Sequence, residues 1–251
     1  MNILIAETIS AAALVVFRSE PGWHVITSTP KEFAAHLPEA EALIVRSATE
    51  ITQNLLGRAP KLRVIGRAGI GVDNVDIEAA TARGIVVMNT PGGNAISVAE
   101  HTLALMLVLA RPIAQASAST KSGKWEKGKF LGTELSGKTL GIIGLGSIGM
   151  EIASRSRSLG MKVVAQDPYV SHELAKERGV DLVAADELLA VSDYISLHLS
   201  LTPETHHLLG RHAFAKMKQG VRIINCARGA LIDSAALDEA LRSGKVAGAA
   251  L

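Results

Sequence analysis

The segment 144–149 contains three glycines in the pattern GxGxxG and could form a turn that holds a negatively charged group. The apolar run 139–143 leads directly into this segment, and a helix-like stretch, 150–159, follows it. A second apolar run, 161–166, then ends at Asp167. The glycine pattern alone is weak evidence. A strand, a glycine turn, a helix, a second strand and a terminal acid in this order indicate a dinucleotide-binding site.

Each glycine has its own part in such a turn. Gly144 permits a sharp turn at the strand end, Gly146 lets a pyrophosphate approach the backbone, and Gly149 lets the helix pack close to the sheet. The N-terminus of the helix adds unpaired N–H groups and the positive end of its dipole. Asp167 lies 18 residues after Gly149, where its carboxylate can accept hydrogen bonds from ribose hydroxyls and repel a 2′-phosphate. The sequence therefore predicts NAD rather than NADP, the alternative being a chance turn with Asp167 as a solvated acid.

Short apolar segments alternate with helix-like stretches from the first residue to about residue 90. This alternation predicts a parallel sheet that is covered by helices on both faces. The expected strands are Asn2–Ala6, Trp23–Thr27, Ala42–Val45, Arg63–Arg67 and Ile85–Met88, and the expected helices lie near Ser10–Phe17, Lys31–Leu37, Thr52–Arg58 and Asn74–Arg83.

A long helical segment from Ser97 to about Lys121 separates this part from the rest of the chain. Pro112 interrupts the segment, so we expect a kink or two helices there. The polar stretch 124–138 is expected to be a connecting loop, and Asp233 is a suitable N-cap for a later helix. The strands expected after the loop are Thr139–Ile143, Lys162–Gln166, Asp181–Val183, Tyr194–His198, Val221–Asn225 and Val246–Leu251.

Composition excludes several classes of protein. Of the 251 residues 48% are hydrophobic but only 3% are aromatic, which fits a core of Ala, Val, Ile and Leu around a buried parallel sheet. A net charge of +2 without a basic cluster argues against a nucleic-acid partner. The single Cys226 excludes an internal disulfide and is compatible with a cytoplasmic location. We expect no signal peptide, no membrane contact from the short apolar run 102–110, and no metal site at the adjacent pair His206 and His207.

Three further segments carry a family resemblance. They are GRAGIGVDNVD at 66–76, TPGGN at 90–94 followed by AEHT at 99–102, and NCARGALID at 225–233. Together with the glycine turn they resemble the D-isomer-specific 2-hydroxyacid dehydrogenase family, along essentially the whole chain.

The resemblance implies an α/β fold made of two doubly wound parallel-sheet domains, with an active site in the cleft between them. Residues 1–95 would form a flavodoxin-like substrate-binding domain that lacks its C-terminal return. Residues 96–251 would form a Rossmann domain for NAD, truncated in its last strands. Because a parallel-sheet domain without its last elements leaves an apolar edge uncovered, we expect such an edge here.

The family reaction is a reversible hydride transfer between C2 of a 2-hydroxy acid and the nicotinamide of NAD. Arg228 matches the arginine that holds the substrate carboxylate, a task that suits a guanidinium because it forms two parallel hydrogen bonds. The family's histidine, which moves the hydroxyl proton, and the glutamate that pairs with it would lie past residue 251, so we expect residues 1–251 alone to turn over poorly or not at all. His198 is interpreted as a wall beside the cofactor and His101 as a buried core histidine. The expected cofactor contacts are Gly144, Gly146, Ser147, Ile148, Gly149, Asp167, His198, Leu199, Cys226, Ala227 and Arg228.

By the same resemblance, five residues of the first domain are matched to the substrate. Arg46 is the candidate for a substrate phosphate, because that charge needs a cationic partner; the alternative is a solvated arginine. Ser47 adjoins it, and Gly69 and Asn94 are candidates for backbone or amide contacts. Ile70 stands where some relatives have threonine, so a hydroxyl contact is absent there.

Within the family, the resemblance is greatest to enzymes that oxidise D-3-phosphoglycerate to 3-phosphohydroxypyruvate, the first step of L-serine biosynthesis. Two alternatives remain open, a glyoxylate or hydroxypyruvate type of 2-keto acid reductase and an NAD-sensing, corepressor-like binding protein. The segment 97–138 resembles the dimer contact of the family, so we expect a homodimer.

Overall fold

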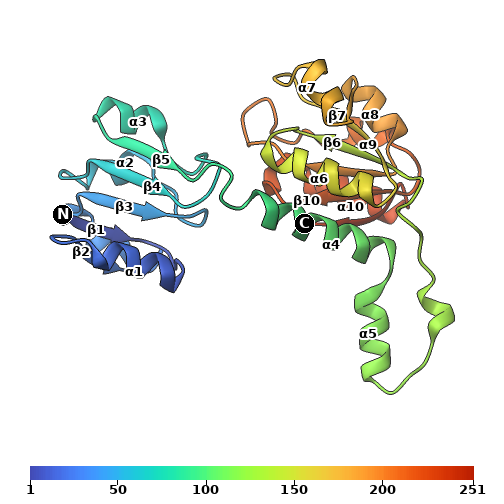
Figure 1. Cartoon of the computed structure of the whole chain (residues 1–251), viewed down its shortest axis with the longest axis horizontal. Coiled ribbons are helices and arrows are strands. Elements are labelled where there is room, and N and C mark those ends of the chain that lie inside the picture. The colour runs from blue at the N-terminus through green and yellow to red at the C-terminus, as the bar shows by residue number, and fades with distance from the viewer. The chain divides into compact units, whose positions relative to one another are not determined.

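In the computed structural model, which describes all of residues 1–251, the chain forms two compact units, Met1–Asn94 and Ala95–Leu251. Figure 1 shows that each unit is built around its own sheet. In unit 1 the sheet is five-stranded and parallel, in the order β2-β1-β3-β4-β5. Its strands are β1 (Asn2–Ile5), β2 (His24–Thr27), β3 (Ala42–Val45), β4 (Val64–Arg67) and β5 (Val86–Asn89). This is the flavodoxin-like strand order.

The two faces of this sheet are covered unequally. Side chains alternate along a strand, so Leu4, Leu43 and Ile65 share one face, where they form a closed core with α2 (Gln53–Gly57) and α3 (Ile77–Ala82). The opposite face packs against α1 (Ala11–Ser19) through residues such as Ile3, Leu14 and Phe17. Beyond α1 this face forms an open groove of about 940 Å³, and Val86 and Met88 of β5 are 57% and 58% exposed.

One expected helix of unit 1 is wrong. In place of an α-helix over 31–37, the chain forms two successive 3-10 turns, η1 (Phe33–Ala35) and η2 (Leu37–Glu39). Their backbone bonds span three residues, as in His36 N–H to the carbonyl of Phe33. Pro38 lies within the second turn, and because proline has no N–H it cannot donate the bond that would continue an α-helix through this segment.

In unit 2 the sheet is six-stranded and parallel, in the order β11-β10-β9-β6-β7-β8. Read from the other edge, this is the Rossmann order 3-2-1-4-5-6, so both doubly wound sheets expected from the sequence are confirmed. The strands are β6 (Thr139–Ile143), β7 (Lys162–Gln166), β8 (Asp181–Leu182), β9 (Tyr194–Leu197), β10 (Val221–Asn225) and β11 (Val246–Ala250), and the helices between them are α6 (Ser147–Ser158), α7 (His172–Glu177), α8 (Ala185–Val191), α9 (Arg211–Lys216) and α10 (Ser234–Arg242).

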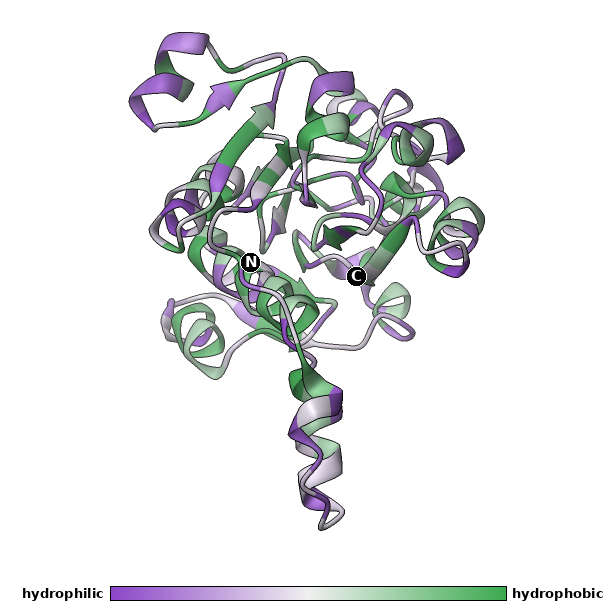
Figure 2. Cartoon of the chain, turned by 90° about the vertical axis from the view of Figure 1, so that its right-hand side faces the viewer, coloured by the Kyte–Doolittle hydropathy of each residue, from purple (hydrophilic) through white to green (hydrophobic).

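Two helices precede this sheet, α4 (Ala95–Ala110) and α5 (Ile113–Lys121), and they are bent by 68° at Pro112 as the sequence predicts. One face of α4 is buried at Ala99, Thr102 and Met106, and α4 packs along α6. His101 lies on the other face and is exposed, so its interpretation as a core histidine is wrong. In Figure 2, α5 stands away from the sheet and carries mixed colours, from hydrophobic at its start to pale and hydrophilic further along.

No helix of the chain is by itself long and apolar enough to cross a bilayer. Only α4 and α5 taken together, across the bend between them, reach the length and apolar composition that a membrane-spanning helix needs.

Candidate active site

The predicted cofactor residues of unit 2 all follow the carboxyl ends of four neighbouring strands, β10, β9, β6 and β7. In an open parallel sheet, ligands bind beyond this edge at the point where the strand order reverses, which here lies between β6 and β9. The fold therefore brings these residues to one edge. The turn 144–149 follows β6, Asp167 follows β7, His198 and Leu199 follow β9, and Cys226, Ala227 and Arg228 follow β10.

The three glycines of the turn are required for different reasons. Gly144 has a φ of 94°, and a Cβ there would collide with the carbonyl of His198 at the end of the adjacent strand. A Cβ on Gly149 would collide with the carbonyl oxygen of Gly144. At Gly146, in contrast, φ is −71° and a Cβ would meet nothing within 4 Å. The chain's own packing thus demands Gly144 and Gly149, whereas the open space over Gly146 fits the approach of a pyrophosphate.

Helix α6 begins inside the turn, at Ser147, three residues earlier than expected from the sequence. Its N-cap is Gly146, and no side chain caps it, so the first N–H groups face the open space over the turn. A twelve-residue helix presents the positive end of its dipole at this place, which stabilises an anion.

The Asp167 carboxylate lies beside the same turn. Its Oδ2 accepts a hydrogen bond from the N–H of Leu145 at 2.7 Å, and its Oδ1 accepts one from the N–H of Tyr169 at 2.8 Å. These two bonds fix the carboxylate at the end of β7, half-buried, next to the residue that separates Gly144 from Gly146. The acid and the turn are therefore one hydrogen-bonded unit, and they fit the ribose and the pyrophosphate of a dinucleotide.

His198 directly follows β9, one residue beyond the strand's observed end. Its Nε2 is hydrogen-bonded to the hydroxyl of the buried Ser196 at 2.7 Å, and burial lowers the pKa of His198 to about 4. At neutral pH this imidazole is therefore uncharged, and the backbone carbonyl of His198 lies close against the Gly144 turn.

This lowered pKa predicts a pH dependence of stability. Below about pH 6.5 the unfolded chain protonates His198 while the folded protein does not, so the free energy of unfolding falls as the pH drops from 6.5 towards 4. We expect His198 to contribute up to about 3 kcal/mol to that fall. Denaturant unfolding of wild type and His198→Gln at pH values across this window measures the contribution. His101→Gln, at an exposed position, is the control, and equal pH slopes in all three proteins would contradict the prediction.

Arg228 is presented by a tight turn after β10. The buried side chain of Asn225 closes this turn, because its Oδ1 accepts from the N–H of Ala227 at 3.0 Å and its Nδ2 donates to the carbonyl of Arg228 at 2.8 Å. The Arg228 Nη1 donates to the carbonyl of Ala227 at 3.0 Å. Asp233 caps the following helix α10, as predicted from the sequence.

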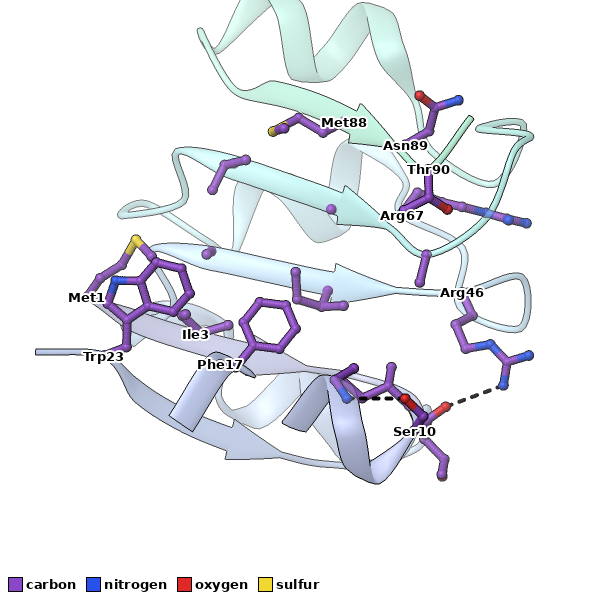
Figure 3. A pocket seen from close by; sticks show the side chains of 18 residues that line it. Met1, Ile3, Ser10, Phe17, Trp23, Arg46, Arg67, Met88, Asn89 and Thr90 are labelled. Atoms are coloured by element: carbon purple, nitrogen blue, oxygen red, sulfur yellow. Dashed lines mark hydrogen bonds between the residues drawn. The ribbon is translucent and has the colours of Figure 1, made fainter. Parts of the chain in front are cut away.

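The substrate candidates lie in unit 1, also at the carboxyl ends of strands. Arg46 and Ser47 follow β3, and Gly69 and Ile70 follow the neighbouring β4. The Arg46 Nη1 donates to the carbonyl of Thr8, after β1, at 3.3 Å, the bond that reaches Arg46 in Figure 3. In the order 2-1-3-4-5 the reversal point lies between β1 and β3, so Arg46 stands where this fold binds ligands. Asn94, the last candidate, is the exposed final residue of unit 1.

Two charged residues that were not predicted join this set. Arg67 ends β4 and is only 7% exposed, and Figure 3 shows its side chain at the same end of the sheet as Arg46. Gly69, with a φ of 154°, packs against this guanidinium, and a Cβ there would collide with it. The second is Glu7, after β1, which is 8% exposed. A charge at the end of an otherwise apolar strand is the sequence signal that could have identified both.

Comparisons with known proteins agree with this geometry. A family model described as "D-isomer specific 2-hydroxyacid dehydrogenase, NAD binding domain" matches residues 103–251. A curated protein named D-3-phosphoglycerate dehydrogenase, from Archaeoglobus fulgidus, is 52% identical over the whole chain, which covers 48% of that protein. The chain thus spans about half the length of the curated relatives it matches.

Two solved structures extend the similarity to the fold. The TT0316 protein of Thermus thermophilus is 38% identical with a TM-score of 0.89, over 99% of this chain and 80% of that one. A D-lactate dehydrogenase of Aquifex aeolicus, solved with NAD and lactic acid, is 32% identical with a TM-score of 0.88, over 99% of this chain and 75% of that one. The glycine turn, the acid after β7 and these similarities together show an NAD-binding unit. The chain belongs to the D-isomer specific 2-hydroxyacid dehydrogenase family.

Proposed function

We propose that the protein to which this chain belongs oxidises D-3-phosphoglycerate to 3-phosphohydroxypyruvate with NAD. The observation that carries the proposal is a second ligand-edge arginine, Arg46, in addition to Arg228. A guanidinium suits each anionic group of the proposed substrate, a carboxylate and a phosphate. Curated relatives at about half identity carry the name of this enzyme, which supports the same substrate.

Each arginine has a separate task in the proposed reaction. Bound NAD supplies the acceptor for the hydride that leaves substrate C2. Arg228 holds the carboxylate next to that carbon through two parallel hydrogen bonds, and it stays charged throughout. Arg46 holds the phosphate. His198 is unsuited to take the hydroxyl proton, because burial lowers its pKa to about 4 and makes it a weak base. That task is left to the family's histidine and glutamate.

The test compares a phosphorylated substrate with its unphosphorylated counterpart, D-glycerate, in the protein to which this chain belongs. We expect Arg46→Ala to lower kcat/KM for D-3-phosphoglycerate by about 10- to 100-fold, because one charge-assisted contact is lost. The kcat/KM for D-glycerate should not change. Arg58→Ala is the control, because Arg58 is also exposed and also donates to one backbone carbonyl, at the far end of α2.

The other outcomes identify the alternatives. A wild-type preference for glyoxylate or hydroxypyruvate over the phosphorylated substrate would replace the proposal with a 2-keto acid reductase. Saturable NADH binding without turnover of any of these substrates would favour an NAD-sensing protein.

We also propose a homodimer formed through α5 and the segment that follows it. Trp125 and Leu131 of this segment are 81% and 83% exposed. The segment is held to α5 by a hydrogen bond in which the Ser119 hydroxyl donates to the Glu126 carboxylate at 2.9 Å. Large apolar side chains on an ordered, projecting segment are typical of an interface.

Light scattering tests the dimer. We expect the wild-type chain to have twice the mass of one chain and the double variant Trp125→Ser, Leu131→Ser to have the mass of one. Tyr169→Ser, at a 94% exposed position outside this segment, is the control and should remain dimeric. A monomeric wild type would reject the proposal. A cytoplasmic location stays a prediction of the sequence.

A further inference from the structure

The loop 46–49, which carries Arg46 and Ser47, is built around a buried carboxylate from another strand. Glu7 follows β1, is 39 residues distant from Arg46 in the sequence, and is only 8% exposed. A buried carboxylate requires hydrogen bonds or a countercharge, because its transfer out of water is costly. The bonds that Glu7 makes are all with this loop.

Three backbone N–H groups of the loop donate to this one carboxylate. Oε1 of Glu7 accepts from Arg46 at 2.9 Å and from Thr49 at 3.0 Å, and Oε2 accepts from Ala48 at 3.3 Å. The loop thus encloses an anion that belongs to the chain itself. These three N–H groups are directed inward and are unavailable to an external anion.

The loop is held from its other side by Asn74. The side-chain Nδ2 of Asn74 donates to the carbonyls of Arg46 and Thr49, each at 2.7 Å. The backbone of Asn74 is itself fixed, because its carbonyl accepts from the N–H of Ile51 at 2.8 Å. Both ends of the four-residue loop are therefore held by side chains: its N–H groups donate to Glu7, and its carbonyls accept from Asn74.

This arrangement determines how the loop can recognise an anion. Since the N–H groups of Arg46, Ala48 and Thr49 are occupied, and since the Glu7 carboxylate lies beneath them, the groups that remain for a phosphate are the Arg46 guanidinium and the N–H and hydroxyl of Ser47. The guanidinium is also anchored next to Glu7, because it donates to the carbonyl of Thr8 at 3.3 Å. A fixed base reduces the conformational entropy that a long side chain loses when it binds.

We infer that Glu7 is a positioning residue for phosphate recognition: its carboxylate organises the loop 46–49 so that Arg46 is presented to the phosphate of the substrate. The inference rests on the proposed function. Glu7 does not touch the substrate; it acts through the loop. If Glu7 had a purely structural role, its replacement would lower the stability of the fold or the affinity for all ligands equally. If Glu7 is a positioning residue, its replacement lowers the affinity for the phosphorylated ligand selectively.

The decisive variant is Glu7→Gln, which preserves shape but places an amide N–H₂ opposite backbone donors. Glu41→Gln is the matched control, because the Glu41 carboxylate accepts the backbone N–H of Asn2 at 2.8 Å at the opposite end of the same strands. Two readouts are taken on the 251-residue chain by NMR, amide hydrogen exchange of Arg46, Ala48 and Thr49, and titration with D-3-phosphoglycerate and with D-glycerate. Glu7→Asp is the second variant, since it keeps the charge but is too short to reach all three donors, and it decides the matter if Glu7→Gln does not fold.

We expect Glu7→Gln to speed hydrogen exchange of these amides about tenfold or more, which corresponds to the loss of one charge-assisted hydrogen bond. The affinity for D-3-phosphoglycerate should fall by a similar factor, and the affinity for D-glycerate should not change. Glu41→Gln should alter neither. If the wild type prefers the phosphorylated ligand and the preference survives Glu7→Gln or Glu7→Asp, the inference is overturned and the proposed function stands. A wild type without any preference overturns both, and the exchange rates then report only on the loop.

Discussion

Replacing Gly146 with alanine is expected to weaken NADH binding by about 10- to 100-fold without lowering the thermal stability of the chain. The backbone at Gly146 is extended, with φ of −71° and ψ of −163°, which alanine adopts without strain, and its Cβ would meet no atom of the protein. The methyl group would instead occupy the space in which the pyrophosphate approaches the N-terminus of α6. Fluorescence titration with NADH and thermal unfolding of the same samples measure the two effects.

Gly149→Ala is the matched comparison, because its Cβ would collide with the carbonyl oxygen of Gly144 inside the protein. Overpacking of this kind costs about 1–3 kcal/mol, so the midpoint of unfolding should fall by several degrees. Loss of stability in Gly146→Ala, or undiminished NADH affinity in that variant, would contradict the role assigned to the open space.

Replacing Arg228 with lysine is expected to lower kcat/KM for the carboxylate substrate on the order of a hundredfold or more, although the charge is preserved. Asn225 fixes the turn from which Arg228 projects, and a guanidinium on that fixed base can hold both carboxylate oxygens in one plane. A lysine ammonium is a point charge and cannot reproduce the two parallel bonds.

Steady-state kinetics of the protein to which this chain belongs, together with the Kd for NADH, separate substrate binding from cofactor binding. Arg242→Lys, at an exposed ion pair on α10, is the control and should behave as wild type. An unchanged kcat/KM in Arg228→Lys would refute the carboxylate role, and an equal loss of NADH affinity would assign the effect to the expected cofactor contact of Arg228 or to its turn.

Strand positions were predictable from the sequence because parallel strands buried on both faces form short, continuous apolar runs. Strands β1, β3, β6, β7 and β10 were predicted to within one residue at each end. The family model and the strand order confirm the nucleotide-binding unit expected from the glycine turn and Asp167. The assignment of individual contact residues stays a prediction.

Helix boundaries and burial were harder to predict, for identifiable reasons. α4 is apolar almost all round, so the sequence alone does not reveal which face is buried, and His101 was placed on the wrong one. The start of α6 was missed because glycine is a poor helix former, yet Gly149 lies in its first turn to avoid a collision. Glu7 resembles a solvated acid in the sequence, because its partners come from residues about 40 positions later.

The different demands on the three glycines have an evolutionary consequence. Gly144 and Gly149 are required by the packing of the chain itself, so a descendant that no longer binds a nucleotide would still need both glycines in order to fold. The middle position alone would be released to drift. Among homologous sequences, a residue other than glycine at the position of Gly146 should therefore mark proteins that no longer bind the cofactor. It should do so better than loss of the whole GxGxxG motif.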